Sequence, residues 1–250
     1  MTLTEFFHIH PRAAIAFSGG VDSAYLLSAA LTCGATVKAY YVKSPFQPQF
    51  ELEDATRLAQ QLGADMKVIP VDVLCHEVIC RNPKDRCYHC KKIMFSHVLE
   101  AAKADGYDLI LDGTNASDDL ADRPGVKALR EYSVRSPLRE CGLTKEEIRL
   151  LSKEAGLFTW NKPAYACLAT RIPTGEEITP EKLTRTEAAE AYLSGLGLRD
   201  FRVRLMGSNA KIQVSPADLE RLMEHREDIV KKLKQSYDHV LLDLEVRNEQ

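Results

Sequence analysis

The stretch SGGVDS, residues 18–23, holds the side chains best suited to chemistry on a phosphate group. Its two glycines allow backbone amides to approach an anion closely, and a helix that begins just after them adds a partial positive charge. The hydroxyls of Ser18 and Ser23 can hydrogen-bond phosphate oxygens, and the Asp22 carboxylate can hold a magnesium ion that contacts the same phosphate. Because no Gly-Lys-Ser/Thr sequence follows, we interpret this stretch as a phosphate-binding loop other than a Walker A loop.

Three cysteines are the second set of candidates for chemistry. Cys87 and Cys90 are separated by two residues in DRCYHCKK (85–92), and Cys167 lies in ACLATR (166–171). A zinc site needs four ligands, and the absence of a second ligand pair at suitable spacing disfavours zinc. A redox dithiol at a helix start, inert core thiols and two ligands of an iron–sulfur cluster also fit this spacing, and these alternatives stay open. We interpret the remaining cysteines as thiols without a chemical role: Cys33, Cys75, Cys80 and Cys141.

The stretches that must position these residues alternate between strand and helix. Such alternation predicts a doubly wound parallel α/β sheet, in which ligands bind beyond the carboxyl ends of the strands. The phosphate-binding loop follows the first strand, as that rule requires. The predicted strands are 13–17, 36–42, 66–72 and 107–113, and the predicted helices between and after them are 22–34, 52–63, 88–103 and 144–157.

The pattern changes after this last helix. Residues 158–179 show little periodicity, which is typical of a functional loop. The segments that follow predict a helix at 180–195, two strands (FRVRLMG and KIQVS), a helix at 216–234 with a possible break, and a last strand (HVLLDL). We therefore predict a smaller α+β C-terminal domain, with the two domains spanning residues 1–172 and 173–250.

Composition and charge narrow the class of protein. Apolar residues make up 45% of the chain and charged residues 28%, as in ordinary globular proteins. The net charge of −3 disfavours a broad nucleic-acid-binding surface. Seven cysteines, an odd number, in a chain without a basic and apolar leader indicate a reducing compartment. No apolar run reaches the length needed to span a membrane, so we predict a cytoplasmic protein.

Two motifs carry a first resemblance. SGGxDS after a first strand resembles the PP-loop of the ATP pyrophosphatase superfamily, and DGTN (112–115) is similar to that superfamily's GTNxxD segment after the fourth strand. Members cleave ATP between the α- and β-phosphates, adenylate a substrate and release pyrophosphate. The resemblance therefore implies ATP and Mg²⁺ as cofactors, with Asp22 holding the metal. It assigns nucleotide binding to Ser18, Gly19, Gly20, Asp22, Ser23, Thr114 and Asn115.

The stretch KPAYACLATRIPTGEEIT (162–179) is similar to PAxxCLASRIPYGxxIT of the LarE family, and the similarity covers nearly the whole chain. It implies an ATP-dependent sulfur transferase that converts a carboxylate of pyridinium-3,5-biscarboxylic acid mononucleotide to a thiocarboxylate, toward the nickel-pincer nucleotide of lactate racemase. It also implies a homo-oligomer and a small-molecule nucleotide substrate. The implied roles are the sulfur-bearing residue for Cys167, the substrate pocket for Lys91, a phosphate for Arg171, Arg202 and Arg204, and Mg²⁺ binding for Glu190.

The chain departs from the simplest family pattern in two ways. Lys211 and Gln213 stand where relatives usually have Arg and Glu, so we assign Gln213 no metal role. In some members the cysteine matching Cys167 gives up its own sulfur and becomes dehydroalanine, whereas others carry a CxxC and resemble iron–sulfur proteins. We predict that Cys87, Cys90 and Cys167 bind a [4Fe–4S] cluster whose open iron can carry a labile sulfide. The sacrificial use of Cys167 is the competing hypothesis, and the sulfur donor is left open.

Other functions share parts of this pattern. A tRNA thiolase also uses a PP-loop and an adenylated intermediate, and it is the main alternative. The acidic balance and the small C-terminal part disfavour it. A ligase that uses ammonia would leave Cys167 unexplained, and a nucleotide sensor would not need Asp22 and Lys91.

Overall fold

The computed structural model describes residues 1–118 and 124–245, and the chain forms two compact units. The first unit comprises Met1–Val73 and Asp85–Lys162, and the second comprises Leu74–Lys84 and Pro163–Gln250. No helix among the described residues is both long and apolar enough to cross a membrane.

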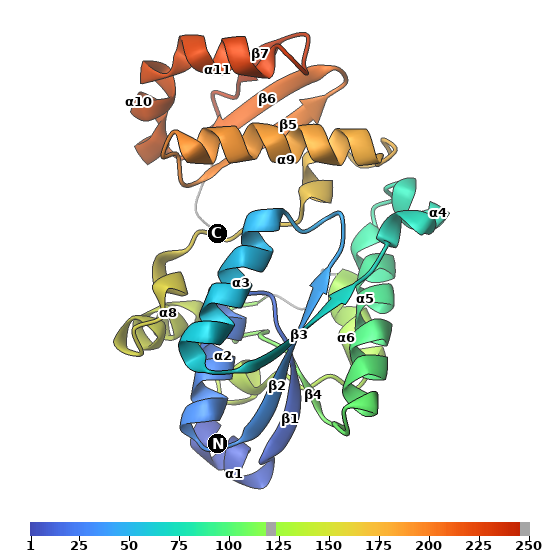
Figure 1. Cartoon of the computed structure of the whole chain (residues 1–250), viewed down its shortest axis with the longest axis vertical. Helices are drawn as coiled ribbons and strands as arrows, with labels where there is room; N and C mark the ends of the chain where they lie inside the picture. The colour runs from blue at the N-terminus through green and yellow to red at the C-terminus, as the bar shows by residue number, and fades with distance from the viewer. Residues whose placement is uncertain (119–123, 246–250) are drawn as a thin grey trace. The chain divides into compact units, whose positions relative to one another are not determined.

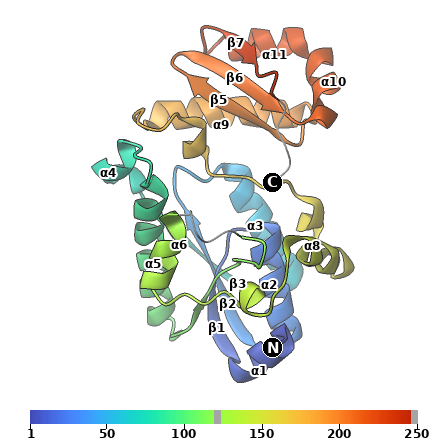
Figure 2. The same ribbon diagram turned by 180° about the vertical axis from the view of Figure 1, so that it is seen from behind.

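The first unit is built on a parallel sheet with the strand order β3-β2-β1-β4. Helices α2, α3 and α8 lie on one side of it, and α5 and α6 on the other (Figures 1 and 2). This is the predicted doubly wound α/β architecture. The strands are β1 (Arg12–Ala16), β2 (Thr36–Lys43), β3 (Asp65–Pro70) and β4 (Ile110–Leu111), and the helices are α1 (Leu3–Ile9), α2 (Val21–Thr32), α3 (Gln49–Leu62), α5 (Arg86–Ala104), α6 (Pro124–Glu131), α7 (Pro137–Glu140) and α8 (Lys145–Glu154).

Local sequence explains why these elements begin and end where they do. The two central strands, β1 and β2, are buried along most of their length, as expected for strands covered on both faces. Helix α8 begins with a capping box, in which Thr144 Oγ1 accepts from the Glu147 amide and Glu147 accepts from the Thr144 amide. Helix α3 ends at Gly63, whose φ of 63° is left-handed and suits glycine.

The second unit holds a separate sheet of order β5-β6-β7. Strands β5 and β6 pair antiparallel, whereas β6 and β7 pair parallel. The predicted break in the helix at 216–234 is confirmed, because His225 ends one helix and begins the next. The elements are α9 (Pro180–Gly195), β5 (Phe201–Met206), β6 (Asn209–Val214), α10 (Pro216–Glu224), α11 (Arg226–Leu233) and β7 (Val240–Leu242).

The segment Leu74–Lys84 belongs to the second unit; it contains α4 (Glu77–Cys80) and all but the first residue of η1 (Val73–Cys75). Its anchor is Asn82, which is 1% exposed and has a φ of 53°. The Asn82 side-chain amide donates to the carbonyls of Ile172 (3.3 Å) and Pro173 (2.8 Å), and its own carbonyl accepts from the Gly175 amide at 2.8 Å. The second unit therefore resumes at Pro163, whereas we placed the domain boundary at residue 172. Long-range contacts of this kind leave no local sequence pattern from which the boundary could be predicted.

Two further differences concern the segments around the site. The predicted strand 107–113 is only two residues long, Ile110–Leu111, where it pairs with β1 and is followed by a single bridge from Leu111 to Arg135. The predicted loop 158–179 contains two 3₁₀ turns, η2 (Phe158–Asn161) and η3 (Leu168–Arg171). Of the acidic run after Asn115, residues 119–123 lie outside the described residues.

Asp105, at the end of α5, ties that helix to the sheet and makes folding sensitive to acid. Its carboxylate accepts from the Tyr40 hydroxyl at 2.9 Å and lies 3.1 Å from the Lys67 ammonium and 3.2 Å from that of Lys38. The hydrogen bond from Tyr40 and the two lysines lower the pKa of Asp105 to about 2. The unfolded value is about 3.9, so this stabilisation is complete above about pH 4 and is lost as the pH falls toward 2.

We therefore expect Asp105→Asn to lower the free energy of unfolding at pH 7, with the gap to wild type narrowing below about pH 4. Urea denaturation at a series of pH values measures this gap. Asp65→Asn is the matched control, because Asp65 also pairs with Lys38 (3.1 Å) but its side chain is 65% exposed, so a small and constant effect is expected. A gap for Asp105→Asn that is independent of pH would contradict the assignment.

Candidate active site

The turn between β1 and α2 forms the predicted phosphate-binding loop. The Ser18 amide donates to Ser23 Oγ at 3.2 Å, and the two hydroxyl oxygens lie 3.0 Å apart. The Gly20 amide donates to Ser18 Oγ at 3.3 Å, and Ser23 Oγ donates to the Gly20 carbonyl at 3.2 Å. The structure therefore brings Ser18, Gly20 and Ser23 together at the start of α2, where the helix dipole favours an anion.

Gly19 is required in this turn for two separate reasons. Its φ is +73°, a conformation that L-residues with side chains rarely adopt. A Cβ atom at this position would also lie 3.0 Å from Ala55 Cβ of helix α3. The loop is thus held against a second helix, which fixes its backbone before any ligand binds.

Asp22, on the first turn of α2, is positioned by two elements that are distant in sequence. Asn115 Nδ2, after β4, donates to Asp22 Oδ1 at 3.1 Å, and the Lys145 ammonium, at the start of α8, pairs with Oδ2. A carboxylate beside a phosphate-binding loop fits the oxygen ligand that Mg²⁺ prefers. A magnesium ion would compete with Lys145 for Oδ2. Sequence reasoning missed Lys145, although the capping box at Thr144 already placed it at a helix start.

In the DGTN segment after β4, the backbone of Gly113 lies close to the start of α2 and the Asn115 side chain faces Asp22. A Cβ on Gly113 would lie 2.9 Å from the Ser23 amide nitrogen, so only glycine fits beside the start of α2. Asn115 faces Asp22, as described above. The Thr114 hydroxyl instead donates to Asp112 Oδ2 at 2.6 Å, and nucleotide binding by Thr114 stays a prediction.

Lys91 and the CxxC pair lie in the first turns of α5. Lys91 packs its aliphatic chain against α6, since a Cβ on Gly125 would lie 2.7 Å from Lys91 Cδ. Within residues 1–118 and 124–245, no hydrogen bond or ion pair holds its ammonium, and substrate binding by Lys91 stays a prediction. Cys87 is exposed and Cys90 is buried, and their spacing of three places them on one side of the helix. Among the described residues no group of three or more His, Cys, Asp and Glu side chains is arranged to hold a metal ion.

Cys167 lies in the second unit, on a loop whose backbone carbonyls are held by arginines. Arg202 donates to the Ala164 carbonyl, Arg171 to the Ala166 carbonyl at 2.8 Å, and Arg204 to the Thr170 carbonyl at 3.0 Å. The Cys167 carbonyl accepts from the Thr170 amide at 2.9 Å and from its hydroxyl at 2.8 Å. We call residues 164–170 the cysteine loop. Its backbone is fixed on both sides of the sulfur.

Arg171 and Arg202 are engaged within the protein, and phosphate binding by either of them stays a prediction. The two side chains are only 1% and 4% exposed, and their guanidinium groups are directed at the cysteine loop and its supports. Both also stack on the Tyr165 ring, at 4.6 Å for Arg171 and 4.9 Å for Arg202. The sequence identifies these side chains as charged, but it does not reveal that they are buried in the folded protein. Phosphate binding by Arg204, which is partly exposed, stays a prediction.

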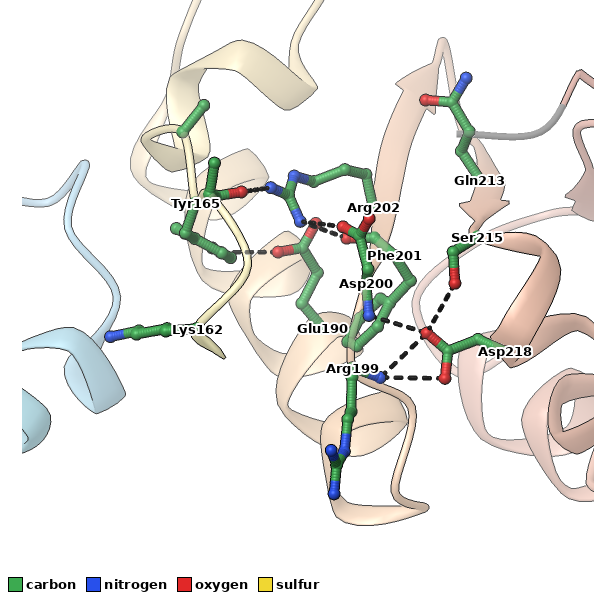
Figure 3. Close-up of polar contacts among 12 residues, drawn as sticks. Lys162, Tyr165, Glu190, Arg199, Asp200, Phe201, Arg202, Gln213, Ser215 and Asp218 are labelled. Atoms are coloured by element: carbon green, nitrogen blue, oxygen red, sulfur yellow. Dashed lines mark hydrogen bonds and ion pairs between the residues drawn. The ribbon is translucent and has the colours of Figure 1, made fainter. Parts of the chain in front are cut away.

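Glu190 of α9 is the centre of this buried network. Its carboxylate accepts from Arg171 Nε at 2.8 Å and Nη2 at 3.0 Å, from the Tyr165 hydroxyl at 2.6 Å and from the Val203 amide at 2.9 Å. Burial and then the negative charge of Glu190 raise the pKa of Tyr165, so its hydroxyl stays a donor. Figure 3 shows Tyr165 beside Glu190, whereas Arg202 donates to the Phe201 carbonyl and pairs with Asp200. Both Glu190 oxygens are thus engaged within the network, and Mg²⁺ binding by Glu190 stays a prediction.

Asp218 of α10 holds the start of β5 in place. Asp218 accepts from the Arg199 amide at 3.1 Å, from the Asp200 amide at 2.7 Å and from Ser215 Oγ at 3.2 Å, which fastens the turn that leads into β5 (Figure 3). Sequence reasoning missed Asp218, and no local pattern marks it.

Gln213 of β6 supports the third arginine. Its Oε1 accepts from Arg204 Nε at 3.1 Å, and its Nε2 donates to Asp243 Oδ2 at 3.3 Å. The Lys211 ammonium pairs with the same Asp243 oxygen at 2.8 Å. Gln213 therefore orients Arg204, and the two departures from the family pattern have a structural role.

Comparisons with known proteins cover most of the chain. No family model matches the sequence. The pyridinium-3,5-bisthiocarboxylic acid mononucleotide synthase of Lactiplantibacillus plantarum is 33% identical over 236 residues, which are 93% of this chain and 86% of the synthase. An uncharacterized protein of Synechocystis sp. is 40% identical over 224 residues, 89% of this chain and 83% of that protein.

Part of the chain is also similar to a more distantly related enzyme. The tRNA-specific 2-thiouridylase MnmA of Thermotoga sp. is 24% identical over 193 residues, which are 60% of this chain and 54% of MnmA. The likeness to the synthase, in contrast, is above 30% and spans nearly the whole chain. The chain therefore belongs to the LarE family of the PP-loop superfamily, the family of the pyridinium-3,5-bisthiocarboxylic acid mononucleotide synthase.

Proposed function

We propose that the protein is an ATP-dependent sulfur transferase that converts a carboxylate of pyridinium-3,5-biscarboxylic acid mononucleotide to a thiocarboxylate. The observation that carries this proposal is the extent of the family relationship: it covers 93% of the chain for the synthase against 60% for MnmA. A coverage of 93% takes in the cysteine loop and its arginine supports as well as the PP-loop. The tRNA thiolase is therefore the less supported alternative.

The first step is adenylation, and the first unit supplies its groups. A carboxylate oxygen of the substrate attacks the α-phosphorus of ATP, and the bond to the β-phosphate oxygen breaks to release pyrophosphate. The PP-loop amides and the hydroxyls of Ser18 and Ser23 would hold the phosphates, and Asp22 would hold Mg²⁺ against them. Lys91 offers an ammonium that can pair with the anionic substrate.

The second step transfers sulfur, and Cys167 is the residue placed for it. Its thiolate attacks the acyl carbon of the adenylate, and AMP leaves with the bonding electron pair. In the sacrificial form of the reaction, a base then removes the Cα proton of Cys167. The Cβ–S bond breaks, leaving the sulfur on the product as a thiocarboxylate and dehydroalanine in the chain. The fixed backbone of the cysteine loop would hold the sulfur in one orientation.

The competing form uses an iron–sulfur cluster bound by Cys87, Cys90 and Cys167. Thiolates are the preferred ligands of such clusters. Cys87 and Cys90, on one side of α5, could supply two of the three thiolate ligands. Cys167 of the second unit would supply the third ligand. When bound, the cluster would supply a sulfide from outside the chain.

Iron content distinguishes the two forms. For a cluster, we expect protein purified without oxygen to contain iron and acid-labile sulfide, and Cys87→Ala and Cys90→Ala to lose both. Cys141→Ala is the control, since Cys141 follows α7 in the same unit and lies outside the proposed ligand set. Iron-free wild-type protein, with Cys167 lighter by one sulfur after a single turnover, would exclude the cluster and support the sacrificial form.

Lys145 is expected to matter for the ATP step, because its ammonium reaches the Asp22 carboxylate beside the phosphate-binding loop. A cation at this place can stabilise charge on the phosphates, and removing one such contact commonly lowers the rate about a hundredfold or more. We expect Lys145→Met to lower pyrophosphate release at least about tenfold. Lys153→Met, on the same helix but with its ammonium 4.8 Å from the Trp160 ring, should release pyrophosphate at the wild-type rate. Equal rates of pyrophosphate release in the two variants would show that Lys145 takes no part in the ATP step.

Pyrophosphate release also tests the function as a whole. With ATP and Mg²⁺ present, the rate should rise on addition of the pyridinium dicarboxylate nucleotide and should not respond to unmodified tRNA. Dependence on tRNA alone would support the thiolase alternative, and release without any acceptor would contradict both. We also propose that the enzyme is a homo-oligomer and that it acts in the cytoplasm.

A further inference from the structure

A cavity of about 90 Å³ lies in the second unit, and no residue of the cysteine loop lines it. It is lined by residues of α9, including Arg185, and by the segment 232–237 at the end of α11, including Lys232, Ser236 and Tyr237. None of these residues takes part in the network around Glu190. The cavity is therefore a separate feature that needs its own explanation.

One buried polar atom of the cavity lining lacks a partner. Arg185 Nε is buried and makes no hydrogen bond within the described part of the chain, whereas the buried Tyr237 hydroxyl lies beside Thr186. The Arg185 guanidinium lies 4.9 Å above the Tyr237 ring, and its Nη2 donates to the Gly207 carbonyl at 3.3 Å. Tyr237 as a whole is only 4% exposed. Buried donors are nearly always satisfied, so an acceptor is missing here.

The chemistry of the missing acceptor follows from the donors. An arginine Nε–H can only donate, and burial raises the pKa of Tyr237, which keeps its hydroxyl proton available. Arg185 and Lys232 add two positive charges, and no Asp or Glu is among the lining residues. A guanidinium, an ammonium and hydroxyl groups together match the oxygens of a phosphate.

The size of the cavity favours the same class of ligand. A single water needs roughly 10–15 Å³ of such space, so this cavity has room for several waters or for one small oxyanion. Lys232 and Ser236 are exposed, and the Lys232 ammonium donates to Gln235 Oε1 at 3.4 Å, so an anion could reach Arg185 from solvent. We propose that the cavity formed by Arg185, Lys232, Ser236 and Tyr237 binds a small oxyanion of the phosphate class, either a free anion or the phosphate of a nucleotide.

The test follows the Arg185 Nε–H resonance by NMR, because the PP-loop also binds phosphates and a local reporter is needed. Inorganic phosphate, pyrophosphate and AMP are titrated separately into the full-length protein. We expect a saturable shift of this resonance with at least one of them. Saturation with the inorganic anions but not with AMP identifies a free anion, and saturation with AMP identifies the phosphate of a nucleotide.

Two variants and a control make the proposal falsifiable. Lys232→Ala should weaken binding at least about tenfold, since a hydrogen bond to a charged group is lost. Tyr237→Phe should reduce the rise in melting temperature on adding the anion, because one hydrogen-bond donor of the cavity is removed. Lys231→Ala, one residue from Lys232 but outside the cavity lining, should bind like wild type. No shift with any of the three anions, or equal affinity in Lys232→Ala and wild type, would overturn the proposal.

Discussion

Replacing Cys167 by serine is expected to abolish thiocarboxylate formation while pyrophosphate release continues. The two steps use different residues: the PP-loop with Asp22 serves adenylation, whereas Cys167 serves sulfur transfer. A serine hydroxyl is a far weaker nucleophile and holds no sulfur to give, so the acyl-adenylate should accumulate or hydrolyse. Product analysis by mass spectrometry, with a parallel pyrophosphate assay, measures both steps in one sample.

The matched control for this prediction is Cys141→Ser, which replaces a cysteine outside the proposed site. It should make thiocarboxylate as wild type does. Loss of pyrophosphate release in Cys167→Ser would show that the cysteine is needed before or during adenylation, and thiocarboxylate formation by Cys167→Ser would contradict its role altogether.

Glu190→Ala is expected to have the largest effect on stability. Arg171 is 1% exposed and its partner carboxylate 5%, so the variant leaves a guanidinium buried without its counter-charge. Breaking a buried pair in this way commonly costs about 3–5 kcal/mol. The cysteine loop should loosen as well, because the same arginine holds the Ala166 carbonyl. Urea denaturation measures the free energy of unfolding. The rate of thiocarboxylate formation shows whether the cysteine loop still holds Cys167 in place.

A double variant and a conservative variant separate the possible causes. Arg171→Met with Glu190→Leu removes both charges and should recover much of the stability, since apolar residues often replace buried pairs well, but not the activity. Glu190→Gln keeps the shape of the side chain but loses the charge that pairs with Arg171. A Glu190→Gln protein of wild-type stability that needs more Mg²⁺ for activity would show instead that Glu190 is a metal ligand, as the family resemblance implied.

The sequence predicted those parts of the fold that depend on local patterns. The alternation of strands and helices led to the parallel sheet, and the capping box at Thr144 and Glu147 marked the start of α8. The PP-loop was recognisable because glycines and serines at a strand-to-helix turn have few other uses. The segment Leu74–Lys84 was not assigned to the second unit, since its anchor is a contact between Asn82 and residues about 90 positions away.

The site was less predictable, because residue type does not reveal burial. Arg171, Arg202 and Glu190 have the charges expected of phosphate and metal binding, yet they pack around Tyr165 and support the cysteine loop. Lys145 reaches Asp22 only after α8 has folded beside α2, so its role follows from packing. Both cases show charged residues whose partners are set by tertiary structure.

The most direct test of the proposed function follows oxygen from the substrate carboxylates. If the enzyme forms an acyl-adenylate, a substrate labelled with ¹⁸O in its carboxylates must pass one labelled oxygen to AMP for each sulfur that it receives. Mass spectrometry of the AMP measures this directly. We predict one ¹⁸O in AMP and a thiocarboxylate that retains the other. Unlabelled AMP together with a thiocarboxylate product would contradict the adenylation mechanism on which the account rests.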